Sequence, residues 1–143
     1  MSNKSKTTIM VVDDDEMNLK MAEFVLQKEM DVDIVTAAGG YQCIELLQRD
    51  SDIDLILLDI QMPRMDGIKT LEMIRKHDDW KNIPVIFLTA SADKETVIKA
   101  GKLGVEGYIK KPFMPKDLVE RVTLALSAKL LNDPAIAALL KGL

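Results

Sequence analysis

The chain has 143 residues, with 23 acidic and 19 basic side chains, and its formal net charge is −4. This length suits one domain whose core is stable without disulfides, and the negative charge argues against a nucleic-acid-binding surface. The single cysteine, Cys43, excludes an internal disulfide, fits a reducing compartment, and falls in a helical pattern where we expect it to be buried. The chain starts with polar residues rather than a secretion signal, and no stretch approaches the ~18 apolar residues of a membrane span. We therefore expect a cytoplasmic protein that does not enter a membrane.

Short apolar runs alternate with amphipathic stretches along the chain. The runs predict five strands, at residues 8–12, 32–36, 53–59, 84–88 and 105–109. The amphipathic stretches predict five helices, at residues 16–29, about 41–49, 65–76, 93–102 and 115–130. In the first helix, the residues at helical spacing are Met17, Met21, Phe24, Val25 and Lys28. Strands and helices that alternate over short connections predict a doubly wound α/β fold with one parallel sheet.

Four of the five predicted strands end in residues suited to charge chemistry. These residues are Asp13 and Asp14 after the first strand, Asp59 at the third, Thr89 at the fourth, and Lys110 and Lys111 at the fifth. Because the carboxyl ends of parallel strands lie along one edge of a sheet, we expect these side chains to converge. Acids and hydroxyls at strand ends also begin turns and cap helices, but that explanation has to hold at four strands at once.

Three converging carboxylates repel one another, so they need raised pKa values or a bound cation. Hard oxygen ligands with room for water suit Mg²⁺ and a phosphate. A threonine hydroxyl and a lysine beside them can stabilise a phosphoryl group in transfer. The central position of Asp59 makes it the natural nucleophile, which gives an acyl phosphate. The sequence has no GxxxxGK[ST] loop, so we expect a phosphoryl donor other than a nucleotide bound by this chain.

The chain resembles the receiver domain of two-component response regulators over about residues 7–129. The resemblance rests on four motifs in the same order as in that family: VVDDD, LLDIQMPRMDG, FLTA and GYIKKPF. It implies a flavodoxin-like (βα)5 fold with the strand order 2-1-3-4-5. It also implies a receiver domain over residues 1–129 that is followed by a C-terminal helical extension over residues 130–143.

The resemblance implies roles for the acids of the site. It makes Asp59 the phosphoacceptor. It also implies that Mg²⁺ is bound by Asp13, Asp14 and Asp59, with Asp13 often acting through water, and by the main-chain carbonyl of Gln61. The next acid, Asp15, is expected only to cap the following helix.

The resemblance also implies roles at the fourth and fifth strands. Thr89 contacts the phosphoryl group, and Lys111 supplies the positive charge next to a cis peptide bond at Pro112. Lys110 is expected to point the other way, because side chains alternate along a strand. Tyr108 matches an aromatic switch residue whose ring turns inward when Thr89 moves toward the phosphoryl group.

Two further positions tune hydrolysis of the acyl phosphate in the family, and here they are Gln61 and Ser91. Neither is an acid that would readily orient an attacking water, so we expect moderately slow autodephosphorylation.

The function implied is that of a switch. A histidine kinase or phosphotransfer protein phosphorylates Asp59, and the surface made by the fourth helix, fifth strand and fifth helix then changes shape for a downstream effector or output domain. Such a protein catalyses only its own phosphorylation and dephosphorylation. One rival is a phosphatase with an aspartyl nucleophile, but Gln61 stands where those enzymes typically have a second acid. The other rival is an interaction module that has lost phosphorylation, which the complete set of site residues opposes.

The last segment of the sequence extends beyond the expected receiver domain. Asp133 and Pro134 predict the start of a short helix. Its apolar residues recur at helical spacing, at Ile136, Leu139, Leu140 and Leu143. A helix this short is marginal alone. It could pack on its own domain, form a homodimer, or begin a linker to an output domain.

Overall fold

The computed structural model describes residues 6–49, 52–90, 93–131, 138–139 and 141. Its strands are β1 (Thr7–Val12), β2 (Val32–Ala37), β3 (Leu55–Asp59), β4 (Val85–Thr89) and β5 (Gly107–Lys110). Its helices are α1 (Glu16–Glu29), α2 (Gly40–Arg49), α3 (Gly67–Lys76), α4 (Lys94–Leu103) and α5 (Pro115–Leu131). Each strand lies within two residues of its predicted range, and the predicted α/β fold is confirmed.

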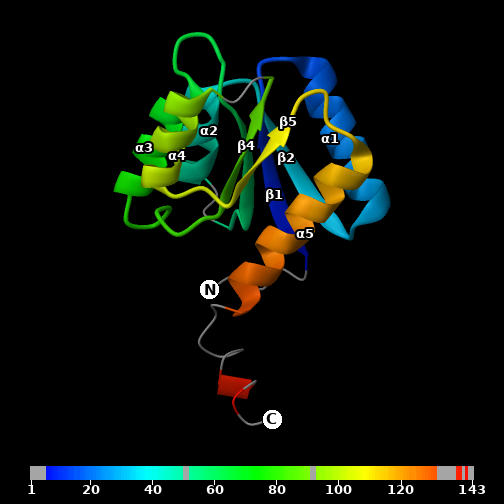
Figure 1. Ribbon diagram of the computed structural model, residues 1–143. Coiled ribbons are helices and arrows are strands. Elements are labelled where there is room, and N and C mark those ends of the chain that lie inside the picture. The colour runs from blue at the N-terminus through cyan, green and yellow to red at the C-terminus, as the bar shows by residue number, and fades with distance from the viewer. Residues whose placement is uncertain (1–5, 50–51, 91–92, 132–137, 140, 142–143) are drawn as a thin grey trace.

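The five strands form one parallel sheet in the order β2-β1-β3-β4-β5, as the resemblance implied. Helices α2, α3 and α4 cover one face of the sheet, and α1 and α5 cover the other (Figure 1). A separate apolar cluster fills the space on each face. All residues of β3 and β4 are buried, since these strands have helices on both sides. In register, Asp59 lies beside Leu88 and Thr89 beside Lys110, so the site residues reach the same edge of the sheet.

Three helices begin at an aspartate whose side chain caps the first turn. Asp15 accepts a hydrogen bond from the backbone of the second residue of α1, as expected of a capping residue. Asp66 and Asp93 cap α3 and α4 in the same way. Helix α4 ends at Gly104, whose φ of 90° is a left-handed conformation that suits glycine.

The residues at helical spacing on α1 do not form its buried face. Met17 and Phe24 are 70% and 67% exposed, and Met21 is also exposed. Of the predicted positions only Val25 is buried. The buried residues of α1 are Ala22, Val25 and Leu26. Helix α1 carries apolar residues on two sides, and its packing against β1, β2 and α5 selects the side that includes Ala22 and Leu26.

The loop between α3 and β4 contains a buried aromatic residue. Trp80 is only 5% exposed and belongs to the cluster under α2, α3 and α4. Its ring stacks on His77, with ring centroids 3.6 Å apart and an interplanar angle of 9°. Because this loop precedes β4, Trp80 lies at the edge of the sheet opposite the carboxyl ends of the strands.

Cys43 is fully buried on α2, as expected. Burial raises the pKa of its thiol to about 12, so the folded protein keeps this cysteine protonated and unreactive.

Helix α5 runs to Leu131, and an ion pair ties its last turns to the sheet. The ammonium of Lys129 lies 3.0 Å from Oδ1 of Asp54, just before β3. The predicted helix start at Asp133 and Pro134 lies outside the described residues. Among the described helices, none is both long and apolar enough to cross a membrane.

Candidate functional site

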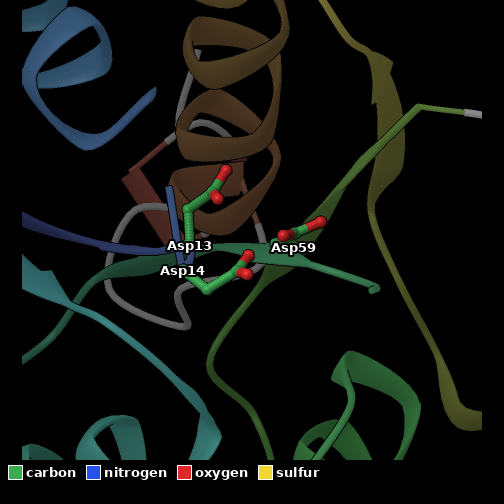
Figure 2. Close-up of side chains that lie close together, drawn as sticks. All are labelled: Asp13, Asp14 and Asp59. Atoms are coloured by element: carbon green, nitrogen blue, oxygen red, sulfur yellow. The ribbon is translucent and has the colours of Figure 1, made fainter. Parts of the chain in front are cut away.

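The three predicted carboxylates converge at the carboxyl ends of β1 and β3. One oxygen from each of Asp13, Asp14 and Asp59 lies within 4.8 Å of the corresponding oxygens of the other two. Figure 2 shows their side chains grouped where the two strands end. Asp13 is fully buried and Asp59 is 4% exposed, whereas Asp14 is exposed. The cluster is therefore enclosed by protein on one side and open to solvent on the other.

Lys111 bridges two of these carboxylates. Its ammonium lies 2.7 Å from Oδ2 of Asp13 and 3.1 Å from Oδ1 of Asp59. Burial alone would lower the pKa of Lys111, but its hydrogen bonds to Asp13 and Asp59 outweigh burial and raise it. Lys110 is exposed and makes no such contact among the described residues, so the two lysines diverge as expected. The bond between Lys111 and Pro112 is cis, as the resemblance implied.

The pKa of Asp59, the candidate phosphoacceptor, depends on burial and on the charges around it. Burial raises the pKa of Asp59 to about 6, and the negative charge of Asp13 and a hydrogen bond with Asp14 act in the same direction. Lys111 opposes this rise but does not cancel it. One lysine therefore does not neutralise the three acids, and the site favours a further cation.

The donor set fits Mg²⁺. Three carboxylate oxygens within reach of one ion are hard ligands, and the exposure of Asp14 leaves room for the waters that Mg²⁺ retains. Gln61 is exposed and lines a groove of about 520 Å³ beside the site, together with Asp66, Thr96 and Lys99. The role of its main-chain carbonyl as a ligand stays a prediction. Ser91 lies outside the described residues.

The predicted switch residues lie on the neighbouring strands β4 and β5, where Thr89 is beside Lys110 and Tyr108 is beside Phe87. Thr89 is 4% exposed, and its carbonyl accepts a hydrogen bond of 2.7 Å from the backbone N–H of Lys111. The hydroxyl of Tyr108 donates a hydrogen bond of 3.0 Å to the carbonyl of Val97 in α4. The Tyr108 ring is half-buried, with its centroid 6.2 Å from that of Phe87. Tyr108 therefore connects β5 to α4.

Two residues at the site were not predicted. Asn18, in the first turn of α1, donates a hydrogen bond of 3.2 Å to Oδ2 of Asp13. Gly67 begins α3 directly against the backbone of Asp59 and Ile60. The capping Asp66 just before Gly67 marks the start of a helix, but no sequence signal marks Asn18, five residues after Asp13.

This fold and this arrangement of acids, threonine and lysine define a class of protein. The family model described as "Response regulator receiver domain" matches residues 9–123, and the chain belongs to that family. Receiver domains act in two-component signalling, interact with histidine kinases and output domains, and are generally switches rather than enzymes.

Similar proteins include both short and long chains. Over 126 residues the chain is 37% identical to hybrid signal transduction histidine kinase D of Dictyostelium discoideum, covering 87% of this chain but only 8% of that kinase. It is 32% identical to the chemotaxis protein CheY1 of Helicobacter pylori, covering 82% of this chain and 95% of CheY1. The crystallised chemotaxis protein CheY4 of Vibrio cholerae has a TM-score of 0.80 and 26% identity, and the match covers 85% of this chain and 100% of CheY4.

Proposed function

We propose that this receiver accepts a phosphoryl group on Asp59, in a reaction that depends on Mg²⁺, from a histidine kinase or phosphotransfer protein. The observation that carries the proposal is the convergence of Asp13, Asp14 and Asp59, with the ammonium of Lys111 bridging Asp13 and Asp59. We place this reaction in the cytoplasm, and we assign the receiver to residues 1–129 and a separate extension to residues 130–143. Helix α5 crosses that boundary and ends at Leu131.

In the proposed reaction, an oxygen of Asp59 forms a bond to phosphorus while the bond from phosphorus to the donor's histidine nitrogen breaks. The electrons of the broken bond remain on the imidazole, and the product on Asp59 is an acyl phosphate. The ammonium of Lys111 moves from the carboxylates to one phosphoryl oxygen. The Thr89 hydroxyl donates a hydrogen bond to a second phosphoryl oxygen. Bound Mg²⁺ would be held by Asp14 and Asp59, with Asp13 and the Gln61 carbonyl completing the set, and it would offset negative charge on the phosphoryl group.

The signal would leave the site through Tyr108. Movement of Thr89 toward the phosphoryl group frees space beside β4, and the half-buried Tyr108 ring fills it. This movement breaks the hydrogen bond between Tyr108 and Val97, so α4 loses its tie to β5. The surface of α4, β5 and α5 then changes shape and binds a downstream effector or output domain.

The phosphodonor would approach across α1. Met17, Met21 and Phe24 form an exposed apolar strip on the helix that starts beside Asp13 and Asp14. Exposed apolar strips of this kind mark protein contacts. A donor helix packed on this strip would bring its histidine to the open side of the carboxylate cluster.

Gln61 and Ser91 take the two positions that tune hydrolysis in the family, and neither is an acid. We therefore propose moderately slow loss of the phosphoryl group. A decay half-life of seconds in Mg²⁺, measured by intact mass after the donor is removed, would contradict this part of the proposal.

The test of the main proposal is to incubate the protein with acetyl phosphate and Mg²⁺ and to measure its intact mass. We expect a gain of one phosphoryl group that is lost in the Asp59→Asn variant and in the presence of EDTA. Absence of any mass gain supports an interaction module that works without phosphorylation. Sustained turnover of a small phosphate ester supports an aspartyl-nucleophile phosphatase.

A further inference from the structure

Both oxygens of the Asp13 carboxylate accept hydrogen bonds from the protein. Oδ1 accepts from the backbone N–H of Asp15 at 2.9 Å. Oδ2 is shared by the ammonium of Lys111 at 2.7 Å and the side-chain amide of Asn18 at 3.2 Å. Asp13 is fully buried, so its orientation depends on these three donors.

Lys111 has two roles that compete. In the structure it lies closer to Asp13 than to Asp59, by 2.7 Å against 3.1 Å. The proposed reaction requires the same ammonium to move to the phosphoryl group on Asp59. That movement removes a charged donor from Oδ2 of Asp13, and a buried carboxylate that loses its partner is strongly destabilised.

We propose that Asn18 is a positioning residue for the acidic pair, an inference that rests on the proposed function. The Asn18 amide keeps Oδ2 of Asp13 hydrogen-bonded when Lys111 moves to the phosphoryl group. The amide is uncharged, so it holds the carboxylate without cancelling the negative charge that attracts the cation. Asn18 and the backbone N–H of Asp15 both belong to the capped start of α1, so one rigid turn holds both oxygens of Asp13.

The Asn18→Leu variant tests this role, because leucine has a similar size and no donor. We expect the dissociation constant for Mg²⁺, measured by titration calorimetry on the unphosphorylated protein, to rise about tenfold. The rate of phosphorylation by acetyl phosphate at saturating Mg²⁺ should fall by a similar factor. The Asn18→Ala variant should show the same changes in affinity and rate. This agreement would exclude an effect caused by the packing of the leucine side chain. The control is Lys20→Ala, since Lys20 is exposed and pairs with Glu16 on the surface of the same helix.

A second background shows whether Asn18 acts through Asp13. In an Asp13→Ala protein, Asn18→Leu should change the affinity for Mg²⁺ by less than about twofold, because the carboxylate that Asn18 holds is gone. If Asn18→Leu lowers the affinity for Mg²⁺ equally in the wild-type and Asp13→Ala proteins, the inference is overturned. It is also overturned if the single variant Asn18→Leu keeps the wild-type affinity and phosphorylation rate. If the wild-type protein neither binds Mg²⁺ nor gains a phosphoryl group, it is the proposed function that fails.

Discussion

Gly67 lies so close to the end of β3 that any side chain at this position would collide with the backbone. A Cβ atom on Gly67 would come within 2.7 Å of the Cα of Ile60 and closer still to the carbonyl oxygen of Asp59. The backbone N–H of Gly67 also donates a hydrogen bond of 2.7 Å to the carbonyl of Ile60. The start of α3 therefore sets the position of the backbone that carries Asp59, the proposed phosphoacceptor.

We expect Gly67→Ala to destabilise the protein by about 1–3 kcal/mol, because neither contact can be relieved without moving backbone. The same displacement should slow phosphorylation of Asp59. Urea unfolding and the acetyl phosphate reaction measure the two effects.

The matched control is Gly101→Ala, inside α4, where an added Cβ has no atom within 4 Å. Alanine there should stabilise the protein by about 0.5–1 kcal/mol, because it favours the helix. If Gly67→Ala unfolds at the same urea concentration as the wild type, the close packing of α3 on β3 is not needed.

At the scale of the elements, Arg75 joins α3 to two segments that are distant in sequence. Its guanidinium donates to the carbonyl of Ile83 at 2.8 Å, in the loop before β4, and to that of Gly104 at 2.7 Å, at the end of α4. It also donates to the carbonyls of Lys81 and Leu103. Helix α4 is thus held at its C-terminal end by Arg75 and nearer its start by Tyr108.

We expect Arg75→Ala to lower the free energy of unfolding by about 3 kcal/mol, since several carbonyls lose a charged donor. Hydrogen exchange should become faster at residues 101–106. Arg75→Lys should recover only part of the loss, because an ammonium cannot match the planar fork of the guanidinium. The neighbouring Lys76→Ala, on the exposed side of α3, is the control, and an equal effect of both alanine variants would contradict this role.

Helix α1 shows which properties of an element can be predicted from the sequence and which cannot. Its bounds were correct because Asp15 and the acids before it mark the start of a helix. Its buried face did not follow from the sequence, because Met17, Met21 and Phe24 have the spacing of a core stripe and yet are exposed. Spacing shows that a stripe exists, but the packing of neighbouring elements decides which side faces the sheet. For the same reason Asn18 could not be predicted, since its contact with Asp13 depends on how α1 is turned.

For the whole molecule, the order of strands was implied by the family resemblance, whereas the convergence of Asp13, Asp14, Asp59 and Lys111 followed from motifs at the strand ends. Parallel strands must bring those ends together, so short sequence signals were enough. Trp80 is different, since it lies in a loop of polar residues and its burial under three helices depends on tertiary packing.

The stability of the whole fold should depend on pH through Asp59. Its pKa in the folded protein is raised to about 6 from an ordinary value of 3.8, so ionising it opposes folding. Stability should therefore fall as the pH rises from about 4 to about 6. Below about 4, Asp59 is protonated in both states and this loss of stability should be absent. The Asp59→Asn variant lacks the penalty, and at pH 7.5 in EDTA it should be more stable than the wild type by about 2–3 kcal/mol.

Urea unfolding of both proteins between pH 4 and pH 8 measures this difference. It should shrink as the pH falls, and Mg²⁺ should raise the stability of the wild type more than that of the variant. A difference that stays constant over this range would show that Asp59 has an ordinary pKa in the folded protein.

The position of Trp80 determines what optical spectroscopy can report on this receiver. It is the only tryptophan in the chain, and it stacks on His77 at the edge of the sheet opposite the carboxylates. Its fluorescence should change strongly when the protein unfolds, because the stacking partner and the apolar surroundings are both lost. Cation binding and phosphorylation at the other edge should leave the emission nearly unchanged. Intrinsic fluorescence is therefore a signal for folding in this protein, and the chemistry proposed at Asp59 has to be followed by mass or calorimetry.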